Sequence, residues 1–175
     1  MLYAERDEEK RKRFCSEIEK IDPADLVYLD ESGIDKFLSR DYARAPRGMQ
    51  VICETKGKKY QRVSMIAAQV EKAILAPFVF EGTTDSKLFN HWLRTCLVPE
   101  LKPGQVVVMD NYCIHKTART REIIEGAGCR ILFLPPYSPD LNPIENLWAI
   151  IKSRIKKIKN SCEDFNQAID MAFSA

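Results

Sequence analysis

The sequence predicts one α/β domain in which a mixed five-stranded sheet is flanked by helices. Two observations carry this prediction. A run of strand patterns is followed by alternating helix and strand patterns, and then by a long amphipathic helix. In addition, residues 106–109 and 130–134 are almost continuously apolar, which is typical of strands covered on both faces. A length of 175 residues fits a single domain with a substantial core.

The first half of the chain is predicted to hold one helix and then strands. Residues 4–20 are highly charged, but Phe14, Ile18 and Ile21 recur at helical spacing. We therefore expect an exposed helix that docks through one narrow stripe and ends at Asp22-Pro23. The strand patterns that follow are residues 26–30, 50–55, 61–69 and 73–80, with a hairpin turn at 56–59.

The second half alternates helices and strands. Residues 85–97 place large apolar side chains on one helical face, and Pro99 ends the pattern. A long helix at residues 143–158 directs Trp148, Ile151 and Ile155 to its apolar side. The other elements are a strand at 106–109, a helix at 117–125, a strand at 130–134 and a final helix at 164–173. This order suits a ribonuclease H-like α/β fold.

Composition excludes several classes of protein. No apolar run approaches the roughly 20 residues that span a bilayer, and the N-terminus has no signal-peptide pattern, so we expect no membrane association. The six cysteines show neither zinc-site nor disulfide spacing, which indicates reduced thiols. We expect a cytoplasmic protein, associated with the nucleoid if it is bacterial. A net charge of +2 does not by itself indicate nucleic-acid binding.

The most informative segment is residues 134–148, LPPYSPDLNPIENLW, in which a proline-rich loop leads into the long helix. Asn142 can cap this helix, Pro143 suits its first position, and Glu145 falls three residues after the cap. Taken alone, this spacing favours a capping box in which Glu145 only satisfies a backbone N–H.

Two further acids change that interpretation. Asp30 and Asp110 each end an apolar strand pattern, and Glu145 lies at the start of a helix. Acids at the ends of elements can meet in space and hold divalent metal ions, because Mg²⁺ prefers hard oxygen ligands. Two such ions about 3.5–4 Å apart can position a nucleophile and stabilise a leaving oxygen in phosphodiester cleavage. The chain has neither of the usual glycine-rich nucleotide-binding loops.

The ordered set of motifs resembles the catalytic domain of the IS630-like branch of the IS630/Tc1/mariner transposase superfamily. The matching stretches are residues 29–33 (LDESG), 82–86 (GTTDS), 103–111 (PGQVVVMDN), 115–116 (HK) and 134–148. Asp110 and Glu145 are separated by 34 residues, a spacing typical of that superfamily.

The resemblance implies a function and a site. We expect a DDE transposase catalytic domain that cleaves DNA at the ends of its element and transfers the strand into target DNA. Asp30, Asp110 and Glu145 would be both the catalytic residues and the ligands of two Mg²⁺ or Mn²⁺ ions. The active complex would contain DNA and a homodimer. Residues 1–21 would form an N-terminal helical extension, and residues 22–175 the ribonuclease H-like catalytic domain.

Several neighbouring residues have two readings. Asn111 and Asn142 could orient the metal ligands through hydrogen bonds, or serve as turn and cap residues. His115 could contact phosphate or assist proton transfer, or only cap the next helix. Glu31 follows Asp30 and points to the opposite side of an extended strand, so we expect a supporting role for it.

DNA contacts are predicted from basic residues. Arg44 and Arg47 lie in an irregular basic stretch, residues 36–47, and Lys152 and Lys156 follow Glu145 along one face of the long helix. Each could bind DNA phosphates, although solvated surface charge is a common alternative.

Two other functions are compatible with parts of this pattern. One is a catalytically inactive, DNA-binding relic of a transposase, against which the intact set of acids argues. The other is a ribonuclease H-like nuclease acting on RNA–DNA hybrids, against which the acid spacing and the proline-rich loop argue. About 25 residues precede the first predicted strand, too few for a three-helix DNA reader. We therefore expect this chain alone to bind DNA weakly and without end specificity.

Overall fold

A computed structural model describes residues 7–35, 47 and 62–174. Its centre is a five-stranded sheet in the order β3-β2-β1-β4-β5. The first three strands are antiparallel neighbours, whereas β1, β4 and β5 run parallel. The strands are β1 (Leu26–Asp35), β2 (Arg62–Val70), β3 (Ala73–Glu81), β4 (Val106–Met109) and β5 (Arg130–Phe133). The predicted mixed sheet with its first strand at the centre is confirmed.

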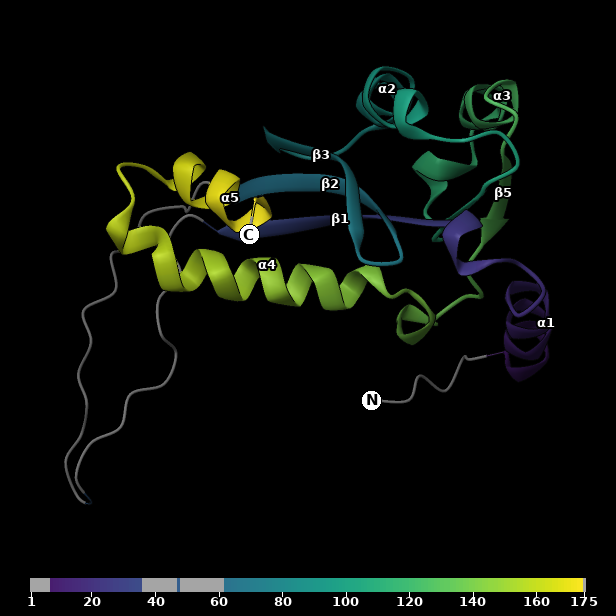
Figure 1. Cartoon of the computed structure of the whole chain (residues 1–175), viewed down its shortest axis with the longest axis horizontal. Coiled ribbons are helices and arrows are strands. Elements are labelled where there is room, and N and C mark those ends of the chain that lie inside the picture. Colours follow the sequence, from purple (N-terminus) through teal and green to yellow (C-terminus); the bar gives the residue numbers. More distant parts are fainter. Residues whose placement is uncertain (1–6, 36–46, 48–61, 175) are drawn as a thin grey trace.

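Helices cover both faces of this sheet (Figure 1). On one face lie α2 (Ser86–Trp92), which continues as a π-helical turn (Leu93–Leu97), and α3 (Ala118–Gly126). On the other face lie α1 (Glu8–Ile18), α4 (Ile144–Ile158) and α5 (Phe165–Phe173). The short 3-10 helices are Pro23–Asp25, Val98–Glu100, Cys113–Lys116, Pro139–Leu141 and Lys159–Ser161.

Alternation along β1 divides the core into these two layers. Val27 and Leu29 pack against α2 and α3, whereas Ile34 packs against α4 and α5. Successive side chains of a strand point to opposite faces, so Asp30 is directed to the α4 face and Glu31 to the α2/α3 face. Asp30 and Glu31 therefore lie on opposite faces of the sheet and pack towards different helices.

Two predicted elements differ from the structure. β1 continues to Asp35 because it pairs with β2 along its whole second half, although residues 31–35 lack an apolar alternation. The predicted helix at residues 85–97 changes to π geometry at Leu93. Pro99 explains the change, since it has no N–H for the carbonyl of Thr95 and its ring crowds that group. The predicted strand at 50–55 and turn at 56–59 lie outside the described residues.

The long helix α4 follows its predicted pattern. Trp148, Ile151 and Ile155 are buried, while Glu145 and Lys156 are exposed. At the other end of the chain, α1 docks through Phe14 onto β1 and β4, as its narrow stripe predicted. None of the helices in the part of the chain that the structure describes is long and apolar enough to cross a membrane.

Candidate active site

The fold brings the three predicted acids to one pocket. Asp30 lies on β1, Asp110 directly follows the parallel neighbour β4, and Glu145 lies in the first turn of α4. The pocket has a volume of about 440 Å³ and also contains the loop that leads into α4. Its lining residues are Asp30, Asp110, Asn111, Tyr112, Leu134, Pro135, Pro136, Tyr137, Ser138, Pro139, Asn142 and Glu145. Their roles in catalysis stay predictions.

The pKa of Asp30 lies well above its ordinary value. Burial, together with the negative charges of Glu145 and Glu31, raises the pKa of Asp30 to about 7. Trp148 supports this carboxyl from α4, where its indole Nε1 donates a hydrogen bond to Asp30 Oδ2 at 3.2 Å. A carboxyl whose pKa is raised by neighbouring carboxylates lies in a site that a cation would stabilise.

Asp110 is held in a different environment. Its Oδ1 accepts hydrogen bonds from the backbone N–H of Tyr112 at 2.9 Å and from His115 Nδ1 at 2.7 Å. Burial alone would raise the pKa of Asp110, but these hydrogen bonds outweigh it and keep the pKa below its ordinary value. The carboxylate therefore stays charged.

His115 connects two acids. Its Nε2 lies 2.9 Å from Glu31 Oε1, while its Nδ1 bonds Asp110, and the imidazole is buried against Phe89 of α2. Burial would lower the pKa of His115, but the hydrogen bonds to Asp110 and Glu31 raise it to about 9. Both ring nitrogens then donate. The alternation that sends Glu31 away from Asp30 thus places it where it can orient His115.

His115 is expected to act by positioning Asp110. We expect His115→Ala to weaken Mn²⁺ binding and DNA cleavage by about 10- to 100-fold, as loss of a group that orients a metal ligand commonly does. His115→Gln keeps a donor near Asp110 and should recover part of the loss. Isothermal titration with Mn²⁺ and a nicking assay would measure both effects. The control is Arg121→Ala, which removes an exposed α3 side chain paired with Glu125. Equal losses in the two histidine variants and the control would refute the positioning role.

Asn111 and Asn142 occupy the rim of the acid pocket. Asn111 Nδ2 donates to the carbonyl of Leu134 and so ties the end of β4 to the end of β5. Asn142 is buried, and no residue in the described ranges bonds its Oδ1. An unpartnered buried acceptor beside three acids suits a site that is completed by water or a cation.

The alternative interpretation of Glu145, a capping box, does not hold. The helix is preceded by Pro143, which already has helical torsion angles (φ −64°, ψ −22°), and no side chain caps α4. The backbone N–H of Glu145 instead bonds the backbone carbonyl of Asn142 at 3.2 Å. The Glu145 carboxylate is exposed, and it has no hydrogen-bond partner within the described part of the chain. It is free to act in the pocket.

The loop at residues 134–142 has an anchor that sequence reasoning missed. Arg11 of α1 forms a two-pronged ion pair with Asp140, with Nη1–Oδ1 at 3.1 Å and Nη2–Oδ2 at 2.7 Å. Such paired contacts fix geometry as well as contribute energy. The two residues lie 129 positions apart, so no local pattern could have indicated the pair.

Three of the four predicted DNA-binding residues lie in the described part of the chain. Arg44 lies outside the described residues, and Arg47 is exposed. Lys152 and Lys156 follow Glu145 along α4, half-buried and exposed respectively, and neither forms an ion pair with a described residue. Two exposed aromatic residues at the acid pocket, Tyr112 and Tyr137, were not predicted. Tyr137 has a positive φ of 53°, which the sequence did not reveal.

The residues of the acid pocket fit a divalent metal ion. The donor set is three carboxylates with an unpartnered amide oxygen nearby, which is the hard-oxygen chemistry of Mg²⁺ and Mn²⁺. Within residues 7–35, 47 and 62–174, no three acidic, histidine or cysteine side chains already converge on one point. The side-chain hydrogen bonds from His115 and Trp148 engage Oδ1 of Asp110 and Oδ2 of Asp30, so the other oxygen of each carboxylate would be the one to bind a metal ion.

A mixed sheet with acids on its two central parallel strands and on the following helix defines a ribonuclease H-like domain with a carboxylate site. The chain belongs to the DDE superfamily endonuclease family, whose model matches residues 25–169. Among known proteins it is similar to the Tc1 transposase in sequence and to the Mos1 transposase in fold.

Named relatives agree with this assignment. The chain is 31% identical over 98 residues to the transposable element Tc1 transposase of Caenorhabditis elegans. The aligned region covers 55% of this chain and 34% of that relative. The Mos1 transposase paired-end complex with left transposon end shares its fold, with a TM-score of 0.70 and 15% identity over 99% of this chain and 61% of that one. The Mos1 mariner paired-end complex with Mn has a TM-score of 0.69 and 17% identity over the same shares. The chain thus spans only part of each relative.

Proposed function

We propose that this chain is the catalytic domain of a metal-dependent DNA transposase, which cuts DNA at the ends of its element and joins the freed 3′-hydroxyl to target DNA. The observation that carries the proposal is the meeting of Asp30, Asp110 and Glu145 in one pocket of a DDE-family fold. The three acids come from separate elements, and only tertiary structure unites them.

Each acid is prepared differently for this chemistry. Asp110 is kept charged by His115, half-buried Asp30 accepts a hydrogen bond from Trp148, and Glu145 extends from the helix start without a partner in the described region. Together they would hold Mg²⁺ or Mn²⁺, and two ions bound here would supply charge stabilisation for the scissile phosphate and its leaving oxygen. The Mos1 neighbour solved with Mn supports this choice of metal.

The protein residues have separate tasks in the proposed reaction. His115 and Trp148 hold the carboxylates of Asp110 and Asp30 in place, and no side chain of the pocket is required as a covalent nucleophile. Asn142 Oδ1 is buried without a partner in the described residues, so a bound water would satisfy it. The loop pinned by Arg11 and Asp140 forms one wall for the incoming strand.

Two copies of the domain are proposed to act together on DNA. The structural neighbour is a paired-end complex, and two ends brought together need two catalytic centres.

A plasmid-nicking assay tests the proposed function. The whole chain is incubated with supercoiled DNA and Mg²⁺ or Mn²⁺, and products are examined for 3′-hydroxyl ends by polymerase extension. We expect nicking that EDTA abolishes and added metal restores. Cleavage that persists in EDTA, or 3′-phosphate ends, would contradict the proposal. Degradation of RNA in an RNA–DNA hybrid while duplex DNA stays intact would instead identify a ribonuclease H-like nuclease.

A further inference from the structure

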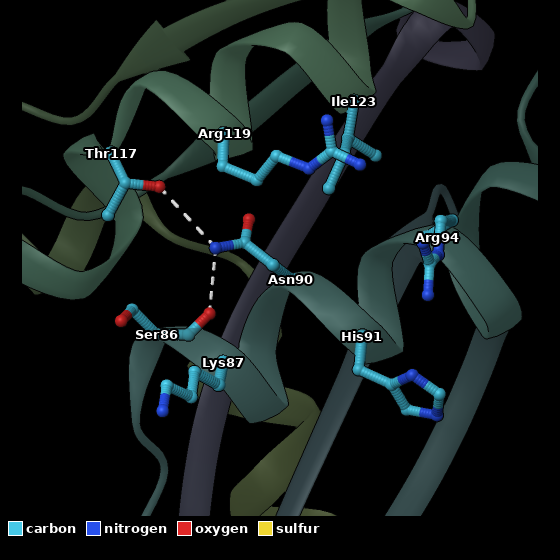
Figure 2. A pocket seen from close by; sticks show the side chains of 8 residues that line it. All are labelled: Ser86, Lys87, Asn90, His91, Arg94, Thr117, Arg119 and Ile123. Carbon is cyan, nitrogen blue, oxygen red and sulfur yellow. Dashed lines mark hydrogen bonds between the residues drawn. The ribbon is translucent and has the colours of Figure 1, made fainter.

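A second pocket, distinct from the acid pocket, lies between α2 and α3 (Figure 2). It has a volume of about 510 Å³ and is open to solvent, since its four longest side chains are exposed. Its lining residues are Ser86, Lys87, Asn90, His91, Arg94, Thr117, Arg119 and Ile123. None of them coincides with the twelve residues that line the acid pocket.

The charged residues that line this pocket are all basic. Lys87, His91 and Arg94 follow one another at helical spacing along α2 and its π-helical turn, and Arg119 faces them from α3. No carboxylate belongs to the lining. Lys87 and Arg94 form no ion pair with any described residue, so their charges are available to a ligand. Arg119 pairs only with the exposed Glu122 at 3.0 Å, and exposed pairs of this kind contribute little and exchange readily.

The floor of the pocket is a fixed polar network. Asn90 Nδ2 donates to the carbonyl of Ser86 at 2.7 Å and to Thr117 Oγ1 at 3.4 Å, as Figure 2 shows. The hydroxyl of buried Thr120 donates to Asn90 Oδ1 at 3.0 Å and lies 2.8 Å from Thr117 Oγ1. These bonds join α2 to α3, so the cationic side chains stand on a rigid base.

The pocket is also connected to the catalytic acids. Thr117 follows the 3-10 helix Cys113–Lys116, which contains His115, and His115 bonds Asp110 at 2.7 Å. The acid pocket and the basic pocket therefore lie at the two ends of one short segment that begins where β4 ends.

We infer that the α2/α3 pocket binds a phosphodiester group of the DNA backbone, as a contact separate from the acid pocket. The inference rests on the proposed function for the identity of the nucleic acid. The lining selects an anion, because it offers three permanent cations and several neutral donors. It does not suit an enclosed small molecule, because its long side chains are exposed and the pocket is open to solvent. A backbone phosphate that stays in contact with water fits both features.

The test is DNA affinity in EDTA, where no cleavage is needed. Fluorescence anisotropy with a short labelled duplex of arbitrary sequence would compare the whole chain with the double variant Lys87→Ala plus Arg94→Ala at two salt concentrations. We expect affinity to fall on the order of tenfold at low salt, and the salt slope to flatten by about one to two units. Lys152→Ala plus Lys156→Ala is the reference for a contact on α4.

The matched control removes the same charge elsewhere. Lys20 and Lys72 are exposed, line neither pocket and form no ion pair with described residues. If Lys20→Ala plus Lys72→Ala weakens binding as much as the pocket variant, the effect is only net charge and the inference is wrong. A photo-crosslinking amino acid in place of His91 should capture the duplex, whereas one in place of Lys20 should not.

A second experiment distinguishes DNA from a free anion as the ligand of the α2/α3 pocket. Inorganic phosphate is titrated against the wild type and the pocket variant, with thermal stability as the readout. If the variant loses stabilisation by phosphate but keeps full DNA affinity, the pocket takes a free anion and the DNA assignment fails. Failure to detect any duplex binding by the whole chain at low salt would also overturn it. Because this test needs no catalysis, its failure is distinguishable from failure of the nicking assay.

Discussion

DNA cleavage by Asp110→Asn is expected to fall by about three orders of magnitude, which corresponds to about 4 kcal/mol of lost transition-state stabilisation. Asparagine keeps the shape of the side chain but removes the charge that His115 and the N–H of Tyr112 now maintain. Asp30→Asn and Glu145→Gln should have effects of similar size, because each removes one of the three carboxylates of the same pocket. Nicked product at saturating Mn²⁺ is the measurement.

These substitutions should leave the protein folded. Glu145 is exposed, and removal of one acid relieves the repulsion that raises the pKa of Asp30. Glu163→Gln is a suitable control, since it makes the same chemical change at an exposed position that lines no described pocket. A folded Glu145→Gln protein that nicks DNA at the wild-type rate would show that the acid assignment is wrong.

The largest loss of stability is expected from Trp148→Ala. Trp148 is 2% exposed, lies edge-on to Phe173 at 6.4 Å between ring centroids, and fills the layer between the sheet and α4. Truncation of a buried tryptophan costs about 3–5 kcal/mol in the free energy of unfolding. That is a large share of the roughly 5–15 kcal/mol typical of a domain. Denaturant unfolding followed by circular dichroism would measure it.

Trp148→Phe separates packing from the hydrogen bond to Asp30. Phenylalanine keeps most of the buried ring but lacks the Nε1 donor, so we expect a smaller stability loss and a reduced cleavage rate in a folded protein. Ile151→Ala is the packing control, since Ile151 is buried in the same hydrophobic layer as Trp148. A Trp148→Ala protein within about 1 kcal/mol of wild type would mean that this layer repacks freely.

Local patterns predicted the parts of the site that depend on local physics. The apolar runs placed β4 and β5, the period of α4 placed Trp148 inside, and alternation along β1 separated Glu31 from Asp30. Asp30 and Asp110 lie at the same level of two parallel neighbours, because Tyr28 of β1 pairs with Val108 of β4 two residues before each acid. The resemblance to a transposase family supplied what the patterns could not, namely the reaction.

Contacts between distant elements were beyond prediction from one sequence. The bridge from His115 to Glu31 depends on how the 3-10 helix turns after β4, and the basic pocket depends on how α2 meets α3. The alternative of a capping box failed for a related reason. Asn142 is compatible with a cap by residue type, but the backbone around Pro143 left its side chain facing the acid pocket. Residue type gives a preference, and tertiary structure decides whether it is used.

The ion pair between Arg11 and Asp140 determines where the protein can be truncated without changing the acid pocket. The family match begins at residue 25 and therefore omits α1 altogether, although α1 is the helix that braces the wall of the acid pocket. A chain that begins at that boundary would keep the three acids of the acid pocket and all the described strands. The loop at residues 134–142 would lose its ion pair with Arg11. The smallest piece that preserves the shape of the site is longer than the region by which the family is recognised.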